Sequence, residues 1–364
     1  MFLDPTSLRA TVSSIVLVGL TAACSSKNDG PAAGTSPTPG DGVLPATLTL
    51  APPASGFQLE THGTVIEPGE DTEYCEILAV PGGPSDVYYV HGTEIEMTRY
   101  SHHLIVSSVD PTSASNDKLE LGSIQHCFGA QELAGLDAVM VGGSQLPTQD
   151  RTFPDGVGLK FTGGEKLVFD YHYYNTSENR IHTGHRMNFD TVDASEIQHI
   201  GHSAPFVNLT IDTPAHSAGK FVGECHYTDD VVVGSVIRHT HQWGKDFSAW
   251  FSGGDHDGEF IWTSKDYEAD TEHKFESPVL VPKDAGFRFE CNYDNTTERD
   301  LKFGLKATDE MCILFSLYWE PSDAPVAPQF CVMRSIDADG VARAAPIDPS
   351  TLLSADGGLF PPAN

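Results

Sequence analysis

The sequence predicts an all-β protein made of two tandem β-sandwich domains that resemble jelly rolls. Short runs rich in β-branched and aromatic residues recur along the chain, and Gly, Pro, Asn and Asp separate them. No segment longer than a few turns shows helical periodicity. The chain has 364 residues, whereas one sandwich usually takes about 100 to 150, so its length suits two.

The expected strands are spread over most of the chain. They cover residues 87–90, 104–106, 167–173, 231–237, 249–251, 287–290 and 313–319. We place the boundary between the domains near residues 193–204, which gives a first domain of residues 56–192 and a second of residues 193–340. Residues 341–364 contain Ala, Pro and Asp without a pattern, so we expect a loose tail there.

The N-terminus has the features of a bacterial lipoprotein signal peptide, residues 1–24. Arg9 precedes a short apolar run that is too brief to span a bilayer. The run ends in Leu-Thr-Ala-Ala-Cys, which resembles a lipobox, although Thr21 stands where Leu is usual. We expect lipidation of Cys24 and a lipid-anchored protein of the cell envelope, on the outer membrane or facing the periplasm. Ordinary cleavage after Ala23 is the alternative.

Two further features agree with a tethered, secreted protein. Residues 25–55 are rich in Gly, Pro, Ser, Thr and Ala, which is typical of a flexible linker. Setting Cys24 aside leaves six of the seven cysteines, an even number suited to disulfides in an oxidising compartment.

The charge of the chain excludes one class of partner and its histidine content favours another. With 51 acidic and 21 basic residues the formal net charge is -30, so nucleic-acid phosphates would be repelled. Sixteen histidines are many for such an acidic chain. Because imidazole is the commonest metal-binding side chain, the histidines raise the expectation of a metal site.

Histidines occur in pairs at two places, and neither pair by itself is enough to predict a metal site. His239 and His241 are two residues apart, so on a strand they face the same side and could share an ion. An isolated pair of this kind is more often a surface feature. His102 and His103 are adjacent and would face opposite sides of a regular strand, unless a bulge, twist or strand end turns one of them.

Two single residues complete the set of possible ligands. His172 lies on the less apolar face of the strand expected at residues 167–173, where a cross-strand polar residue would also fit. Met311 alone would most simply be a core methionine. Together, however, the chain offers three imidazoles in its first half, and two imidazoles with a thioether in its second. Thioether sulfur is soft and selects Cu(I), so the second group indicates redox copper.

The order and context of these residues are similar to those of a known family. The motifs are Ser101-His102-His103-Leu104, Tyr171-His172-Tyr173, His239-Thr240-His241 and Asp309-Glu310-Met311-Cys312. Over residues 71–333 the chain resembles the copper type II, ascorbate-dependent monooxygenases, a family that includes peptidylglycine alpha-hydroxylating monooxygenase and dopamine beta-monooxygenase. Further matches are Asp71-Thr72-Glu73-Tyr74-Cys75 and Pro154-Asp155-Gly156-Val157-Gly158.

The resemblance implies two coppers per chain, one in each domain, facing each other across a cleft. His102, His103 and His172 would hold an electron-storing copper. His239, His241 and Met311 would hold the copper that activates dioxygen and attacks a C–H bond, and are therefore the expected catalytic residues. The reductant would be ascorbate or another one-electron donor.

The resemblance also implies a disulfide pairing, which six cysteines alone leave open among fifteen possibilities. The implied bridges are Cys75–Cys127, Cys225–Cys331 and Cys291–Cys312. The last of these would brace Met311 through its neighbour in sequence.

Departures from the family concern the substrate. Where the amidating branch holds a peptide carboxylate with Arg, Asn and Tyr, this chain has Ile237, Ile313 and Phe315. Arg238 is adjacent but should face away on a strand. We therefore expect hydroxylation of a small, apolar or aromatic substrate. The alternatives are a non-catalytic copper-binding or copper-sensing surface lipoprotein, and a purely structural sandwich.

Overall fold

The computed structural model describes residues 42–113, 116–127, 138–265, 267, 271–322 and 329–344. Within these residues the chain is all-β and contains no α-helix, as expected. Three single-turn 3-10 helices connect strands, namely η2 (Asn116–Lys118), η3 (Ala194–Glu196) and η4 (Gly254–His256). No helix in the described part of the chain is long and apolar enough to cross a membrane. The signal peptide, Cys24 and most of the linker lie outside the described residues.

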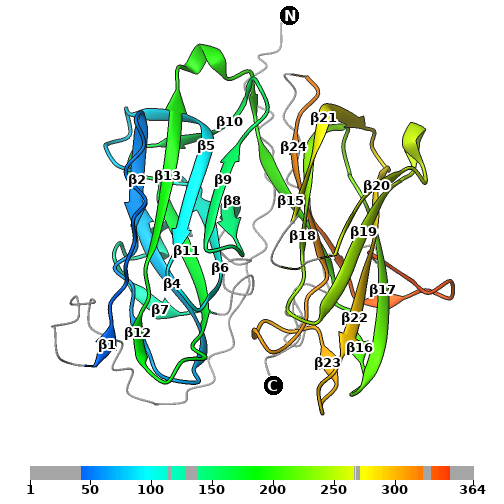
Figure 1. Cartoon of the computed structure of the whole chain (residues 1–364). Coiled ribbons are helices and arrows are strands. Elements are labelled where there is room, and N and C mark those ends of the chain that lie inside the picture. The colour runs from blue at the N-terminus through cyan, green and yellow to red at the C-terminus, as the bar shows by residue number, and fades with distance from the viewer. Residues whose placement is uncertain are drawn as a thin grey trace, which may run out of the picture.

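The first sandwich has two main sheets (Figure 1). One sheet has the order β14-β10-β5-β13-β2, with β9 also paired to β5. Its strands are β2 (Gly56–Glu60), β5 (Val87–Met97), β9 (Thr148–Thr152), β10 (Val157–Thr162), β13 (His185–Val192) and β14 (His199–Ile200). The other sheet has the order β7-β4-β11-β6-β8. Its strands are β4 (Asp71–Ala79), β6 (Ser101–Val109), β7 (Ile124–His126), β8 (Ala138–Ser144) and β11 (Lys166–Tyr174). A small sheet joins β1 (Val43–Leu44), β12 (Arg180–His182) and β3 (Val65–Ile66).

The second sandwich is built in the same way. One sheet has the order β21-β18-β24-β15-β25. Its strands are β15 (His202–Asn208), β18 (Val231–His239), β21 (Glu272–Val281), β24 (Ile313–Trp319) and β25 (Cys331–Met333). The other has the order β20-β19-β22-β17-β27-β26. Its strands are β17 (Ser217–His226), β19 (Gly244–Ser252), β20 (Phe260–Ser264), β22 (Gly286–Asn295), β26 (Ser335–Ile336) and β27 (Val341–Arg343). A two-stranded sheet pairs β16 (Asp212–Thr213) with β23 (Leu301–Lys302).

Strand β11 shows how the first core presents a polar residue at the surface of its sheet. Alternate residues of a strand face opposite sides. Tyr171 and Tyr173 therefore point into the core between the two sheets and are fully buried there. His172 points the other way and is also buried, although it lies outside that core. Something other than the sandwich core must cover it.

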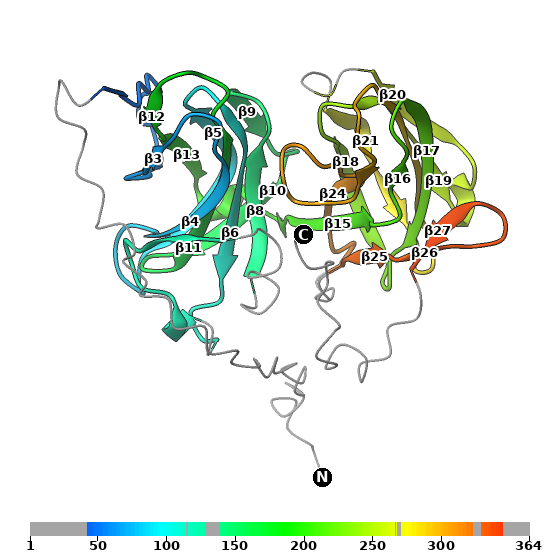
Figure 2. The same ribbon diagram turned by 90° about the horizontal axis from the view of Figure 1, so that it is seen from below.

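The two sandwiches pack directly on each other (Figures 1 and 2). Trp319 at the end of β24 is buried within the apolar core cluster of the first domain. Arg151 pairs with Glu272 at 3.6 Å, and Lys274 Nζ lies 3.5 Å from the carbonyl oxygen of Thr152. The chain passes from one sandwich to the other between β14, which pairs with β10, and β15, which pairs with β24.

The described cysteines form three disulfides, in the pairs that the resemblance implies. Cys75 in β4 bonds to Cys127, which follows β7. Cys225 in β17 bonds to Cys331 in β25, and Cys291 in β22 bonds to Cys312 immediately before β24.

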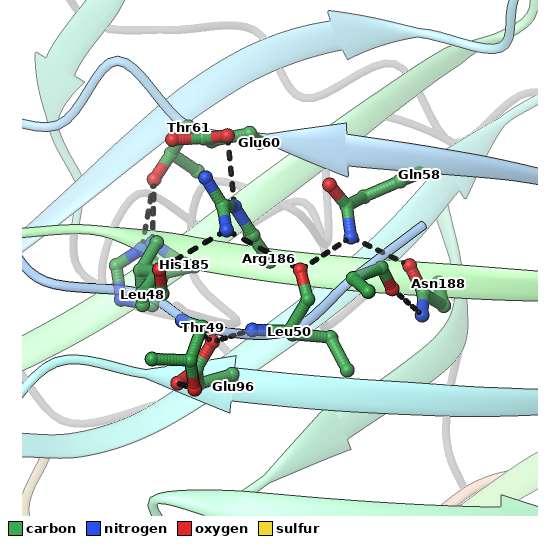
Figure 3. Close-up of polar contacts among 11 residues, drawn as sticks. Leu48, Thr49, Leu50, Gln58, Glu60, Thr61, Glu96, His185, Arg186 and Asn188 are labelled. Atoms are coloured by element: carbon green, nitrogen blue, oxygen red, sulfur yellow. Dashed lines mark hydrogen bonds and ion pairs between the residues drawn. The ribbon is translucent and has the colours of Figure 1, made fainter. Parts of the chain in front are cut away.

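Residues 48–51, expected to belong to a flexible linker, are held on the first domain (Figure 3). The Glu96 carboxylate accepts hydrogen bonds from the main-chain N–H groups of Thr49 and Leu50, at 2.7 and 2.6 Å. Arg186 Nη1 donates to the carbonyls of Leu48 and Leu50. The expectation of a loose spacer up to residue 55 is therefore wrong for this segment, because side chains of the outer sheet satisfy its backbone.

Residues 341–343, expected to belong to a loose tail, form strand β27, and residues 345–364 lie outside the described residues. Strand β27 pairs with β17, and Val341 and Ala342 are buried against the second domain. The sequence there lacks a clear pattern because only three residues pair.

Candidate metal centre

His102, His103 and His172, called here the first set, come together on β6 and β11. In the register between these strands His172 faces His103, whereas Tyr173 faces Ser101. His102 is therefore the extra residue of a β-bulge, and this bulge lets two adjacent histidines turn to one side. The ring centroids of the three histidines are 5.1 to 5.2 Å apart.

Carboxylates orient two of the three rings. His172 Nε2 lies 2.6 Å from Asp71 Oδ1, and His103 Nε2 lies 3.4 Å from Glu73 Oε1. The other ring nitrogens, Nδ1 of His172 and Nδ1 of His103, are buried and have no hydrogen-bond partner among the described residues. The same holds for Nε2 of His102. Buried polar atoms normally have a partner, so these nitrogens suit a ligand such as a metal ion.

His239 and His241 carry the same signature in the second domain. His239 ends β18, and His241 follows two residues later, with the ring centroids 5.2 Å apart. His241 Nδ1 lies 3.0 Å from the main-chain carbonyl of Asp309, and its buried Nε2 has no partner in the described part of the chain. His239 Nδ1 lies 2.7 Å from Oε1 of Gln145, a first-domain residue between β8 and β9.

The main chain of Met311 lies beside that of His241, and its buried side chain belongs to the apolar core cluster of the second domain. The antiparallel register pairs His239 with Ile313, and continuing it by two residues sets Met311 opposite His241. The Glu310 carboxylate joins the two segments, because it accepts hydrogen bonds from the N–H groups of His241, at 3.0 Å, and of Met311, at 3.3 Å. The Tyr293 hydroxyl donates to the Met311 carbonyl at 2.6 Å. His239, His241 and Met311 are called here the second set.

Glu310 is held entirely inside the protein. Burial raises the pKa of its carboxyl to about 8, against the opposing effect of the N–H donors of Trp243, His241 and Met311. A third hydrogen bond, from the Trp243 N–H at 2.8 Å, completes the contacts. One side chain therefore fixes the backbone on both sides of the second set.

The two sets meet. The ring centroid of His102 is 4.5 Å from that of His241 and 6.3 Å from that of His239. The ligand nitrogens of His102, His239 and His241 lie within 4.8 Å of one another, as do those of His102, His103 and His172. In this structure the two domains close on each other here, and five imidazoles form one cluster in place of two separated sets.

The electrostatics of the cluster keep the rings neutral. Burial lowers the pKa of each of the five histidines, and neighbouring histidines lower it further at four of them. At His103 burial also dominates, while Asp170 acts to raise the pKa. A neutral ring has one nitrogen lone pair free for a metal, so the residues present fit the binding of copper through nitrogen.

The residues expected near the substrate also share this side of the second domain. Ile237 pairs with Phe315 as His239 pairs with Ile313, so period two places all four on the same face of the sheet. Ile237 and Phe315 are half-buried. Arg238 faces the opposite way, as expected: it is buried inside the domain, where its guanidinium donates to Ser264 and Thr240.

The groups that orient the ligands, Asp71, Glu73 and Gln145, were not predicted from the sequence. Asp71 and Glu73 lay inside a stretch that already resembled the family, and their spacing of two residues on a strand was a usable signal. Gln145 had no such signal, because only the packing of one domain on the other brings it to His239.

Comparisons with known proteins bear mainly on the second domain. Residues 210–338 match the family model of the copper type II ascorbate-dependent monooxygenase, C-terminal domain. No curated protein matches the chain. Among solved structures, PNGase F, a glycosylasparaginase from Flavobacterium meningosepticum, is 9% identical with a TM-score of 0.29, over 74% of this chain and 98% of that chain. The coconut allergen cocosin is 10% identical with a TM-score of 0.15, over 72% of this chain and 76% of that chain.

Proposed function

We propose that this protein is a copper-dependent monooxygenase, because residues 210–338 match the family model of the copper type II ascorbate-dependent monooxygenase C-terminal domain. It hydroxylates a C–H bond of a small substrate, using dioxygen and a one-electron reductant such as ascorbate. The observation that carries the proposal is the convergence of five neutral imidazoles from two domains. Four of them have a buried ring nitrogen without a hydrogen-bond partner among the described residues, and the fifth, His239, is oriented by the amide oxygen of Gln145.

The first and second sets would hold one copper each. Imidazole nitrogens suit copper, and the Met311 thioether favours Cu(I) at the second set. When bound, copper supplies one-electron redox chemistry and the activation of dioxygen. The residues behind the ligands fix ring orientation: Asp71 and Glu73 for the first set, Gln145 and the Asp309 carbonyl for the second.

The surroundings exclude bulk water from most ligands. His103, His172 and His241 are each less than a tenth exposed, and burial of this kind strengthens electrostatic contacts inside a site. Substrate would approach from the half-buried face formed by Ile237 and Phe315, next to His239.

That face favours a small, apolar or aromatic substrate. Arg238 does not offer a cation there for a carboxylate, since it is turned inward and donates to Ser264 and Thr240. Aliphatic and aromatic side chains discriminate weakly between apolar ligands, so several compounds of similar size should be accepted.

One observation favours a second candidate, a copper-binding or copper-sensing surface lipoprotein without turnover. His102 belongs to both groups of ligand nitrogens that could share an ion. A single ion held between the domains would leave too few ligands for a second, and one copper per chain would then be expected.

Oxygen uptake by the copper-loaded protein separates these candidates. With ascorbate and a panel of small aromatic and aliphatic compounds, we expect two coppers per chain, substrate-dependent oxygen uptake and a hydroxylated product. His172→Ala and His239→Ala should each remove about one copper and abolish the dependence on substrate. Tightly held copper without any substrate-dependent uptake would support the non-catalytic candidate.

We also propose that the chain is anchored in the bacterial cell envelope through lipidated Cys24. The lipobox-like ending of the apolar N-terminal run supports this. Metabolic labelling with a radioactive fatty acid should mark the wild-type protein and not the Cys24→Ser variant. Equal labelling of both would contradict it.

A further inference from the structure

We propose that the groups hydrogen-bonded behind the histidines give electron transfer its direction. Asp71 and Glu73 lower the Cu(II)/Cu(I) reduction potential at the first set, while the neutral acceptors Gln145 and the Asp309 carbonyl leave it higher at the second. The inference rests on the proposed function and identifies Asp71 and Gln145 as paired positioning residues.

The first set is surrounded by acidic groups. Asp71 and Glu73 are two residues apart on β4, so both project to the same side, where β4 runs beside β11. Asp71 contacts His172 Nε2 at 2.6 Å and Glu73 contacts His103 Nε2 at 3.4 Å. Asp170 is fully buried and near enough to His103 to act on its charge. A carboxylate partner makes an imidazole a stronger donor and stabilises the more highly charged ion, Cu(II).

The second set has no carboxylate on a ring nitrogen among the described residues. His239 Nδ1 meets the neutral amide oxygen of Gln145 at 2.7 Å, and His241 Nδ1 meets the main-chain oxygen of Asp309 at 3.0 Å. The Asp309 carboxylate lies elsewhere, 3.6 Å from Arg299. Glu310 accepts main-chain N–H groups, and Arg238 lies buried nearby.

The ligands of the second set reinforce this difference. The Met311 thioether stabilises Cu(I), whereas the first set offers imidazoles alone. Both effects raise the potential of the second set above that of the first. With copper bound at both sets, this difference would favour transfer of one electron from Cu(I) at the first set to Cu(II) at the second. A one-electron donor of the ascorbate class restores the first ion.

The contact between the sets gives the electron a short route. His102 of the first set and His241 of the second are 4.5 Å apart between ring centroids. Gln145 also links the domains, because its amide nitrogen donates to the carbonyl of Tyr267 while its oxygen holds His239. The same residue therefore orients a ligand and ties the domains together.

A reciprocal exchange of nearly isosteric groups tests the inference. Asp71→Asn removes the charge behind His172, and Gln145→Glu introduces one behind His239. We expect Asp71→Asn to raise the ratio of Cu(I) to Cu(II) affinity at the first set about tenfold or more, which corresponds to about 59 mV for a one-electron couple. Gln145→Glu should lower that ratio at the second set by a similar factor.

The readout is an anaerobic redox titration of the copper-loaded, substrate-free protein, followed by the Cu(II) electron paramagnetic resonance signal. The same exchanges made in His239→Ala and His172→Ala backgrounds assign each potential to one set. Glu67→Gln is the control, since Glu67 is an exposed carboxylate that pairs with Arg180. Its potentials should match those of the wild type.

The outcomes separate the inference from the function on which it rests. If the wild type holds fewer than two coppers, the proposed function fails. If it holds two and neither exchange moves a potential by more than the control does, the charge asymmetry is wrong. Asp71→Glu retains the charge and should restore a low potential where Asp71→Asn does not. A raised potential in both variants would show that geometry, and not charge, is responsible.

Discussion

At the scale of single residues, Glu310 decides how the second set is held. Its carboxylate accepts three main-chain hydrogen bonds, from Met311 and from the segment that contains His241. It lies deep inside the domain, where an N–H group left without an acceptor is costly.

Above the Glu310 pKa of about 8, where its carboxylate is ionised, Glu310→Gln should therefore destabilise the metal-free protein by about 1 to 3 kcal/mol. A glutamine has the same size but turns an amide N–H₂ group toward donors that need an acceptor. Urea unfolding measures the loss, with the exposed Glu67→Gln as control. Equal midpoints for the two variants would contradict the role given to Glu310.

His185 provides a second test at this scale, through pH. Its ring is fully buried between the Thr61 and Tyr173 hydroxyls, each 3.0 Å away, and burial lowers its pKa to about 3. An unfolded histidine titrates near 6.5, so below about pH 6.5 the unfolded chain takes up a proton that the folded chain refuses.

His185 therefore makes the folded protein less stable as the pH decreases. Stability contributed by neutral His185 is complete above about pH 6.5 and falls as the pH decreases toward 3, by up to about 1.4 kcal/mol per pH unit. His185→Asn should reduce this slope by about one proton between pH 6 and pH 4. Chemical denaturation at several pH values measures it, and an unchanged slope would show that His185 is protonated in the folded protein.

At the scale of elements, each of the seven expected strands lies within an observed strand, whereas the other strands and some details of the site were not predicted. Alternation of apolar residues at 167–173 places His172 on the face opposite Tyr171 and Tyr173, as β11 shows. The spacing of His239 and His241 likewise gave their common orientation. The local sequence pattern does not predict the bulge at His102, the hydrogen bonds that hold residues 48–51 on the first domain, or the contact of Gln145 with His239. Each of these features depends on a partner far away in sequence.

The Cys291–Cys312 disulfide ties β22 to the residue after Met311. Replacing both cysteines with serine should lower the stability by about 2 to 5 kcal/mol. It should also weaken Cu(I) binding at the second set, because Met311 loses its brace, and leave the first set unaffected. Competition with a Cu(I) chelator measures both affinities. An equal loss at the two sets would indicate general unfolding.

The hydrogen bonds that hold residues 48–51 on the first domain can be tested separately. Glu96→Ala removes the acceptor for the N–H groups of Thr49 and Leu50, and charged hydrogen bonds of this kind contribute about 1.5 to 3 kcal/mol (Figure 3). Cleavage there by a protease of broad specificity should become about tenfold faster or more. The Glu67→Ala variant should be cleaved at the wild-type rate. Equal cleavage rates for the wild type, Glu96→Ala and Glu67→Ala would contradict the docking of residues 48–51.

At the scale of the whole molecule, the five-histidine cluster forms because two sandwiches pack together. Trp319 enters the core of the first domain, Arg151 pairs with Glu272, and Gln145 reaches His239 across the interface. Domain interfaces within a chain often permit relative motion. The five-histidine cluster therefore depends on the relative position of the two domains.

X-ray absorption at the copper edge of the fully reduced protein tests most directly whether both sets bind copper. We expect two coppers per chain with imidazole ligands and a copper–sulfur signal at one of them. Met311→Ile, which keeps the side chain's bulk and apolar character, should lose that sulfur signal while the first copper and its imidazoles remain. An unchanged sulfur signal in Met311→Ile, or its absence from the wild type, would contradict the second set as a copper site.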